Sequence, residues 1–426
     1  MQEGAGVQRY GRCAVTLSRT IPAVQASLAS HVQRLCSTEL GGRLVGTPGE
    51  ARAHDYLTQA LAEAGFDPAP GHAEPFEVIV PHLEAPPRLT VAGSELEYLF
   101  DFCVNVQGAA GGGRARGEAV FLGNGIADER AAGKVAVCTP DPAPTVAAAL
   151  EGYLKRHRAA RDVGALALLQ VTTTPRRGKV MMHRRESPGL PSLDVSPAVL
   201  PVAFGGSQPE LGETGAVVEV VVEQTERHVR SVGNVVMQRG SGPPRLILVA
   251  HYDHVGQVPD GRHFPGAADN ASGVAAVVEA ARELARLPSP GTVLVVLPTA
   301  EEVGMVGSDR FVAQHGSELS ADPLVVEVDE IGGHPGQPIA RWATSAALAR
   351  LAKEASADVG WPVATYALSD GGFSDHVAFL PRFSSVVALT SGSPDGVVHT
   401  LRDTPGRLSL PKLVAAVRLL VQLGRG

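Results

Sequence analysis

Cysteine and aromatic residues are both scarce in this sequence. The chain of 426 residues has 4 cysteines, and aromatic side chains make up 4% of it. None of the cysteines belongs to a C-x-x-C pair, so we expect no cysteine-bound structural zinc. Two disulfides could be drawn between them, but buried free thiols are the favoured interpretation. The four residues are Cys13, Cys36, Cys103 and Cys138.

The sequence also lacks long apolar runs. Its longest apolar stretches, such as LVVEV and RLILVA, are far too short to span a bilayer. The N-terminal residues contain no continuous apolar segment of the kind found in secretory signals. We therefore expect a soluble protein, cytoplasmic as the chain is given. A secreted or periplasmic location stays open if the start is processed or misassigned.

A basic stripe is absent as well. The formal net charge is −7, which argues against nucleic acid as the main partner. Hydrophobic residues make up 44% of the chain and charged residues 19%, so the chain can form a large packed core. Its length suits two or three domains. The sequence says nothing about oligomeric state.

The pattern of apolar residues changes twice along the chain. Residues 20–66 show helical spacing with one glycine-rich break, and residues 85–230 show short apolar segments between turns, typical of a small β-rich domain. From residue 232 onward, apolar strands alternate with amphipathic helices, which predicts an α/β sandwich with a mostly parallel sheet. We therefore divide the chain into an N-terminal extension (1–30), an α/β domain (31–85 and 232–426) and a β-rich insert (86–231).

Metal-binding side chains follow the predicted strands of the α/β domain. Ligands bind outside the carboxyl ends of the strands in an open α/β sheet, so the residues after each strand are the candidates for a site. His, Asp or Glu follows in every case, and a loop leading into a helix adds one more Asp. The candidates are His251, Asp269, Glu301, Glu302, Asp329 and His399. These are donors that zinc accepts.

The number of candidates predicts two metal ions. A single catalytic zinc uses about three protein ligands and one open position. If one glutamate of the pair Glu301–Glu302 serves as a base, five donors remain, enough for two ions when one carboxylate bridges them. Neighbouring residues in an extended segment point in opposite directions, so one glutamate can bind metal while the other faces a water. Spacing alone does not say which glutamate does which.

Asp253 lies two residues after His251, so the two side chains share a face of an extended segment. Asp253 could then accept the imidazole N–H of His251 and fix its tautomer. The alternative is that Asp253 caps a turn.

The order and spacing of these segments resemble the di-zinc aminopeptidase family, which includes aminopeptidase Y, glutamate carboxypeptidase and the glutaminyl cyclases. The resemblance rests on His251-Tyr-Asp253, GAADNASG, AEEVGMVGS, VDEIGG, FSDHVAF and HTLRDT, and on the earlier segment ELGGRLVGTPGEARAHDYL. It covers about residues 35–85 and 232–426. It implies a three-layer sandwich with a mostly parallel, mixed central sheet.

The resemblance also implies roles for the candidates. His251, Glu302, Asp329 and His399 would be terminal ligands of two zinc ions, and Asp269 would bridge them. Asn270 would follow Asp269 across an often cis peptide bond. Glu301 would be the general base that activates a water, and Asp253 would be the hydrogen-bond partner of His251. The family pattern makes His254 and His376 supporting residues rather than ligands.

Three further features bear on the resemblance. The segment GEAVFLGNGIADERAAGKVAVCT, together with RDVGALALLQV, resembles a protease-associated domain, which would cover part of a cleft without supplying catalytic groups. Phe373 stands where some members have a tyrosine that assists an oxyanion, and a phenyl ring cannot donate a hydrogen bond. Glu330 replaces a usual apolar residue beside Asp329.

The resemblance therefore implies a zinc exopeptidase, more specifically an aminopeptidase that acts on peptides. The alternatives are a metallocarboxypeptidase or dipeptidase, a glutaminyl cyclase, and a non-catalytic receptor-like homologue. Every ligand position is filled, which disfavours the last two. A carboxypeptidase would need a basic pocket, for which the late loops offer Arg341, Arg382 and Arg402.

Overall fold

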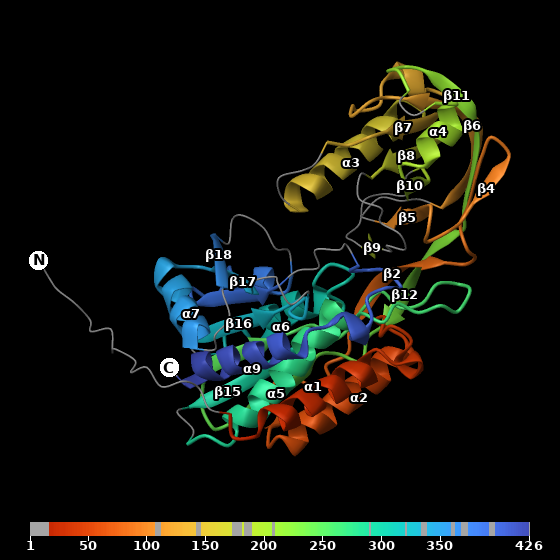
Figure 1. Cartoon of the computed structure of the whole chain (residues 1–426). Coiled ribbons are helices and arrows are strands. Elements are labelled where there is room, and N and C mark those ends of the chain that lie inside the picture. Colours follow the sequence, from red (N-terminus) through yellow and green to blue (C-terminus); the bar gives the residue numbers. More distant parts are fainter. Residues whose placement is uncertain are drawn as a thin grey trace, which may run out of the picture.

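The computed structural model describes most of the chain. The described residues are 17–106, 112–141, 146–172, 181–182, 190–206, 209–288, 291–319, 322–333, 339–358, 363–367, 374–391 and 397–425. They form an α/β domain built on one large sheet and a β-rich domain built on a second sheet (Figure 1).

The α/β domain has an eight-stranded mixed sheet. Its strands, in spatial order, are β1 (Asp67–Pro68), β13 (Val235–Arg239), β15 (Thr292–Leu297), β14 (Pro244–Val249), β16 (Leu324–Val328), β19 (Val386–Thr390), β17 (Ile339–Ala343) and β18 (Val363–Ala367). The four central strands β15, β14, β16 and β19 run parallel to one another. Antiparallel pairing of β13 with β15 and of β17 with β19 makes the sheet mixed, as predicted.

Helices cover both faces of this sheet, which makes three layers (Figure 1). One face carries α1 (Ile21–Leu35), α2 (Pro48–Glu63), α5 (Gly273–Leu284), α7 (Ala346–Asp358) and α9 (Leu410–Arg425). The other face carries α6 (Val306–His315) and α8 (His376–Phe379). In β14, Leu246 and Leu248 pack toward the first layer of helices, while Ile247 and Val249 pack toward the second. The continuous apolar run from Leu246 to Val249 therefore packs against both layers of helices.

The β-rich domain is confirmed by a nine-stranded sheet. In spatial order its strands are β4 (Ser94–Leu96), β3 (Arg88–Val91), β11 (Thr214–Val222), β6 (Gly113–Phe121), β7 (Val135–Cys138), β8 (Ala167–Val171), β10 (Ser192–Val195), β5 (Phe102–Val106) and β9 (Met181–Met182). The helices α3 (Val146–Asp162) and α4 (Val199–Phe204) accompany this sheet. A two-stranded antiparallel ribbon of β2 (Glu77–Leu83) and β12 (Gln224–Arg230) joins the two domains (Figure 1).

The N-terminal helix belongs to the packing of the α/β domain. α1 crosses the predicted boundary at residue 30, and its Val24 and Leu28 are buried in the same apolar cluster as α5 and α9. The domain boundaries themselves stay predictions, as does the protease-associated character of the insert.

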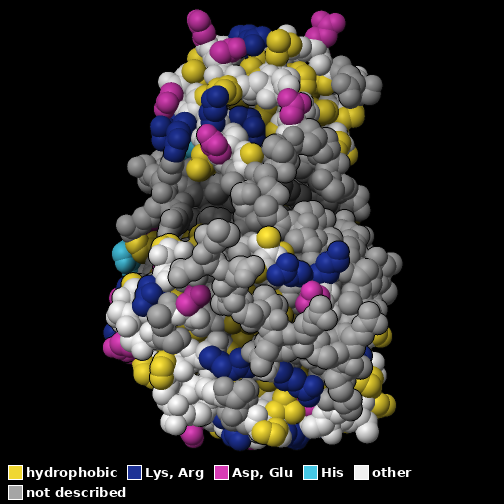
Figure 2. Space-filling view, turned by 90° about the vertical axis from the view of Figure 1, so that its left-hand side faces the viewer, with side chains coloured by type: hydrophobic (Ala, Val, Ile, Leu, Met, Phe, Trp, Pro, Cys, Tyr) yellow, Lys and Arg dark blue, Asp and Glu magenta, His cyan; other side chains and the backbone are white. Residues whose placement is uncertain are grey.

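The described cysteines are buried. Cys36, Cys103 and Cys138 are buried thiols, whereas Cys13 lies outside the described residues. Across the described part of the chain, no helix has both the length and the apolarity that a bilayer crossing requires. On the face shown in Figure 2, Lys and Arg side chains are interspersed with Asp and Glu over the described residues.

Candidate metal centre

The predicted donors meet at one edge of the α/β sheet. The parallel strands β14, β15, β16 and β19 end at the same edge. Each donor follows a strand end or a neighbouring turn: His251 follows β14, Glu301 and Glu302 follow β15, Asp329 follows β16, His399 lies in the loop after β19, and Asp269 lies in the π-helical turn η3 (Ala267–Ser272) before α5. The topology therefore collects side chains that are far apart in the sequence.

One group of donors surrounds His251. Its Nε2 atom lies 3.3 Å from Oδ1 of Asp269 and 3.4 Å from Oδ1 of Asp329. One ligand atom from each of these residues lies within 4.8 Å of the others. Three donors at this separation can converge on a single ion.

A second group surrounds His399. Its Nε2 atom lies 2.8 Å from Oδ2 of Asp269 and 2.9 Å from Oε2 of Glu302. His254 belongs to the same group, and its Nδ1 lies 2.7 Å from Oε1 of Glu302. That contact also suits a hydrogen bond that orients Glu302, the supporting role expected for His254.

The two groups share Asp269, whose Oδ1 faces His251 and whose Oδ2 faces His399. This arrangement matches a carboxylate that bridges two cations. Asp269 and Glu302 are 4% exposed, and among the described residues neither they nor Asp329 form an ion pair with lysine or arginine. Buried carboxylates that lie close together are costly, and cations bound between them would remove that cost. The donor set of imidazoles and carboxylates fits a pair of zinc ions.

Asp253 contacts residues of this centre without belonging to either donor group. It is fully buried, and its Oδ1 lies 3.7 Å from Nδ1 of His251. The same carboxylate accepts backbone N–H bonds from Glu301 at 3.1 Å and Glu302 at 3.4 Å. Asp253 therefore ties the ends of β14 and β15 together, beyond the single contact with His251 that the sequence suggested.

The turn that carries Asp269 is held by two polar side chains. The Asp269–Asn270 peptide bond is cis, and the Asn270 side-chain amide donates to the carbonyl of Val328 at 2.9 Å. Asp403 accepts the backbone N–H bonds of Ala268 at 2.8 Å and of Asp269 at 3.2 Å. Sequence reasoning missed Asp403, although it lies within the quoted segment HTLRDT.

Sequence reasoning also missed Arg43, which lies in the glycine-rich break before α2. Its side chain is fully buried and donates to four backbone carbonyls. The acceptors lie in three separate segments: Leu35, Tyr252, and the pair Pro265 and Gly266. The sequence shows only an arginine inside GGRLVGTPG; its burial, which is rare for a long cationic side chain without a structural task, is visible in the structure alone. Arg43 holds the segments that lead to His251 and Asp269.

The adjacent glutamates have pKa values displaced in opposite directions. Burial raises the pKa of Glu301 well above its usual range, and the charges of Glu302, Asp375 and Asp329 add to this, against the opposing charge of His251. Burial also acts to raise the pKa of Glu302, but the charge of His399 and hydrogen bonds lower it to about 2. A carboxylate that gains a proton easily and a neighbour that stays ionised suit a base and a ligand, respectively.

The remaining sequence candidates lie around or beyond this centre. His376 is buried with Nδ1 3.4 Å from Oε2 of Glu327, and no metal-binding group of described residues includes it. Burial raises the pKa of Glu330, with further contributions from Asp329 and Asp269. Phe373 lies outside the described residues.

Two of the three arginines considered for a carboxylate pocket have exposed side chains. Arg382 is exposed, and its Nε donates to the carbonyl of Gly316 at 3.1 Å. Arg402 is exposed as well, and the side chain of Arg341 lies outside the described part.

Known proteins share this architecture. An aminopeptidase of Pseudomonas aeruginosa is 28% identical over 295 residues, which cover 66% of this chain and 52% of the relative. The chain thus spans about half the length of the curated relatives it matches first. An aminopeptidase from Aneurinibacillus sp. strain AM-1 superposes with a TM-score of 0.66 at 19% identity, covering 93% of this chain and 92% of that chain. A zinc aminopeptidase from Bacillus subtilis superposes with a TM-score of 0.64 at 19% identity, covering 95% of each chain.

The structural similarity, at such low identity, establishes the fold. The sequence itself matches the family model of peptidase family M28 over residues 234–423. That range runs from the start of β13 into α9 and contains all five predicted metal ligands. The chain therefore carries a domain of peptidase family M28.

Proposed function

We propose that this chain is a zinc-dependent aminopeptidase that removes N-terminal residues from peptides. The observation that carries the proposal is the position of Asp269, whose two carboxylate oxygens face two different histidine-containing donor groups. The family match and the aminopeptidases among the relatives support the same activity.

In this proposal the donors divide between two ions. His251 and Asp329 would hold one zinc ion, and Glu302 and His399 would hold the other. Asp269 would be a ligand of both ions. When bound, such a pair of ions lowers the pKa of a water towards about 7 and polarises the scissile carbonyl.

The proton transfers then fall to Glu301. Its carboxylate accepts a proton from the attacking water while the oxygen of that water adds to the carbonyl carbon. Glu301 then gives the proton to the amine as the C–N bond breaks, so that water is added across the peptide bond. Asp253 keeps Glu301 in place, because it accepts the backbone N–H of that residue. Burial, which raises the pKa of Glu301, makes the carboxylate a better proton acceptor.

The proposal is tested with a panel of aminoacyl reporter substrates, assayed with and without a chelator. We expect cleavage of free-amine substrates, loss of cleavage in chelator, recovery on adding zinc, and about two equivalents of zinc per chain. Peptides blocked at the N-terminus should resist cleavage. Cleavage of blocked peptides from the C-terminus would contradict the aminopeptidase assignment and favour a carboxypeptidase. Absence of bound zinc would contradict the metal centre itself.

A further inference from the structure

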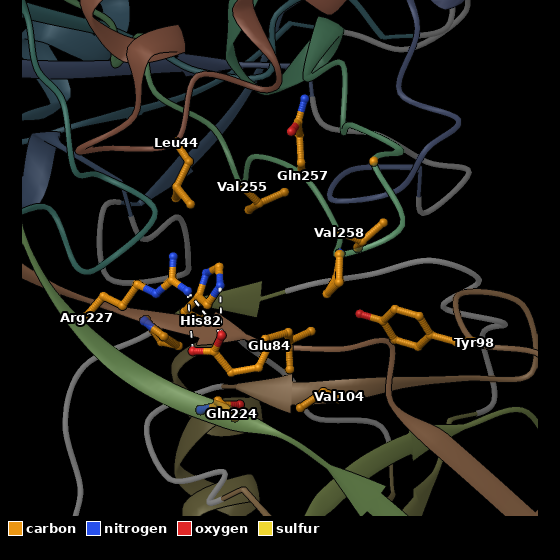
Figure 3. Close-up of a pocket in the computed structure, with 14 residues that line it drawn as sticks. Leu44, His82, Glu84, Tyr98, Val104, Gln224, Arg227, Val255, Gln257 and Val258 are labelled. Carbon is orange, nitrogen blue, oxygen red and sulfur yellow. Dashed lines mark hydrogen bonds and ion pairs between the residues drawn. The ribbon is translucent and has the colours of Figure 1, made fainter.

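A separate pocket lies where the two domains join. It has a volume of about 480 Å³, within the range of small-molecule sites. Its walls come from the ribbon β2/β12, from β5 of the β-rich domain and from the loop that follows His254 (Figure 3). None of the five predicted metal ligands lines it.

The middle of this junction pocket is apolar. Leu44, Val104, Val255 and Val258 contribute aliphatic side chains to its wall (Figure 3). Val255 and Val258 belong to the loop that begins at the metal centre with His251. An aliphatic group of matching size would be stabilised here by removal from water.

One polar end of the junction pocket is Tyr98. The residue is 7% exposed, and in the part of the chain that is described its hydroxyl has no hydrogen-bond partner. Figure 3 shows this hydroxyl pointing into the pocket, toward the side where Glu84 and Arg227 lie. A buried hydroxyl without a partner is unfavourable, and a ligand acceptor atom would satisfy it.

The other polar end is a cluster of His82, Glu84 and Arg227. Nη2 of Arg227 lies 3.2 Å from Oε2 of Glu84, and Nε2 of His82 lies 3.8 Å from the same oxygen. The Glu84 carboxylate also accepts the Thr225 hydroxyl at 2.7 Å. Glu84 is thus satisfied, whereas Nε and Nη1 of Arg227 make no hydrogen bond within the described residues.

The charge of this cluster determines which anionic group of a ligand it can bind. Glu84 neutralises Arg227 formally, and burial together with the Arg227 charge lowers the pKa of His82. The remaining guanidinium donors therefore suit a singly charged carboxylate, which arginine binds in a planar arrangement, better than a doubly charged phosphate.

We propose that the junction pocket binds the carboxylate end of an aliphatic α-amino acid or short peptide. The carboxylate of the ligand lies against Arg227, and its aliphatic side chain packs on Val104, Val255 and Val258. An acceptor atom of the ligand accepts a hydrogen bond from the Tyr98 hydroxyl. The choice of amino acids and peptides rests on the proposed function, because such molecules are its substrates and products. The chemistry of the pocket does not depend on that function.

The test uses isothermal titration calorimetry on the full chain after removal of metal by a chelator. Neither turnover nor metal coordination can then contribute, so failure of the peptidase assignment does not affect the result. The probes are leucine, N-acetylleucine and leucinamide. We expect one site per chain for at least one of the two acids, and at least tenfold weaker binding of leucinamide, which lacks the carboxylate. Tighter binding of leucine indicates a free amino acid as the ligand, and tighter binding of N-acetylleucine indicates a peptide end.

Two variants locate the binding site. Arg227→Gln should weaken binding about tenfold, and the isosteric Tyr98→Phe about threefold to tenfold. Arg230→Gln is the matched control: it lies on the same strand, is exposed, pairs with Glu77 at 3.6 Å and does not line the pocket. No binding of either acid at about 10 mM would overturn the proposal, and so would unchanged binding in Arg227→Gln and Tyr98→Phe.

Discussion

The carboxylate of Asp403 holds the backbone of Asp269 in place. Its two oxygens accept the N–H bonds of Ala268 and Asp269, while its own carbonyl accepts the N–H of Ala267 at 3.2 Å. Asp403 lies four residues after His399, so these bonds join the two loops that carry the donors of one metal group. Asp403 is fully buried where these loops meet.

Replacing Asp403 should therefore weaken metal binding without removing a ligand. Asp403→Asn puts an amide NH₂ where an acceptor is needed, so one of the two backbone N–H groups loses its partner. We expect zinc affinity to fall about 10-fold to 100-fold, as for other residues that orient metal ligands. Competition with a chelating dye measures this. Asp128→Asn, on the surface of the β-rich domain, is the control and should leave affinity unchanged. Equal affinities of the two variants would contradict the role of Asp403.

Arg43 should be essential for stability. Arg43→Ala leaves buried carbonyls in three segments without donors, and we expect the free energy of unfolding to fall by about 3 kcal/mol or more. Urea denaturation measures this change. Arg52→Ala is the matched control, because Arg52 also donates to a backbone carbonyl, that of Glu39, but is exposed. Arg52→Ala should lower the free energy of unfolding by about 1 kcal/mol or less. Similar losses in both variants would refute the importance of burial.

Glu301 and Glu302 should fail in different ways when replaced. Glu301→Gln keeps its shape but cannot accept a proton, so turnover should fall by about 100-fold or more while zinc content is unchanged. Glu302→Gln should lose zinc from the His399 group as well as turnover. Kinetics and metal analysis on the same samples separate the two. If Glu301→Gln retained near wild-type turnover, the assignment of the base would be wrong.

Metal should stabilise the folded chain. Without cations, the three carboxylates of the centre repel one another inside the protein, so chelation should lower the melting temperature. Free zinc at 100 times its dissociation constant should raise the free energy of unfolding by about 2.7 kcal/mol per site. Calorimetry with and without zinc measures this. Asp269→Ala, which removes the shared ligand, should respond to zinc far less than the wild type. An equal response would mean that zinc stabilises the protein from elsewhere.

The β-rich domain should become less stable in mild acid because of His157. Burial lowers the pKa of His157 from 6.5 to about 4. Its Nδ1 lies 2.9 Å from the Ser192 hydroxyl, and its buried Nε2 has no partner among the described residues. Between pH 6.5 and about 4 the unfolded chain therefore binds a proton that the folded chain does not. Stability falls through this window as the pH drops, by roughly 3 kcal/mol in total, and levels off below it.

The matched variants for this effect are His157→Gln, which cannot titrate, and His228→Gln, which replaces an exposed histidine on β12. Urea denaturation of metal-free protein at pH 7 and pH 4.5 should show a smaller pH dependence only in His157→Gln. Identical pH dependence in all three proteins would exclude His157 as the cause.

The sequence by itself determined the layers and the composition of the centre. β14 is apolar from Leu246 to Val249 and β15 from Val293 to Leu297, because helices cover both faces of the sheet, and this pattern is local. A donor placed directly after such a strand must lie at the carboxyl edge, so the meeting of His251, Glu302 and Asp329 followed from their positions in the chain.

Only the tertiary structure decided how the centre is supported and what lies beside it. Arg43 contacts carbonyls more than 200 residues away, and Asp403 contacts the turn of Asp269 from another loop. Tyr98 and Arg227 line opposite ends of one pocket. Periodicity fixes which face of its own element a side chain occupies. It carries no information about which distant backbone or side chain comes to lie opposite, because that depends on the path of the whole chain.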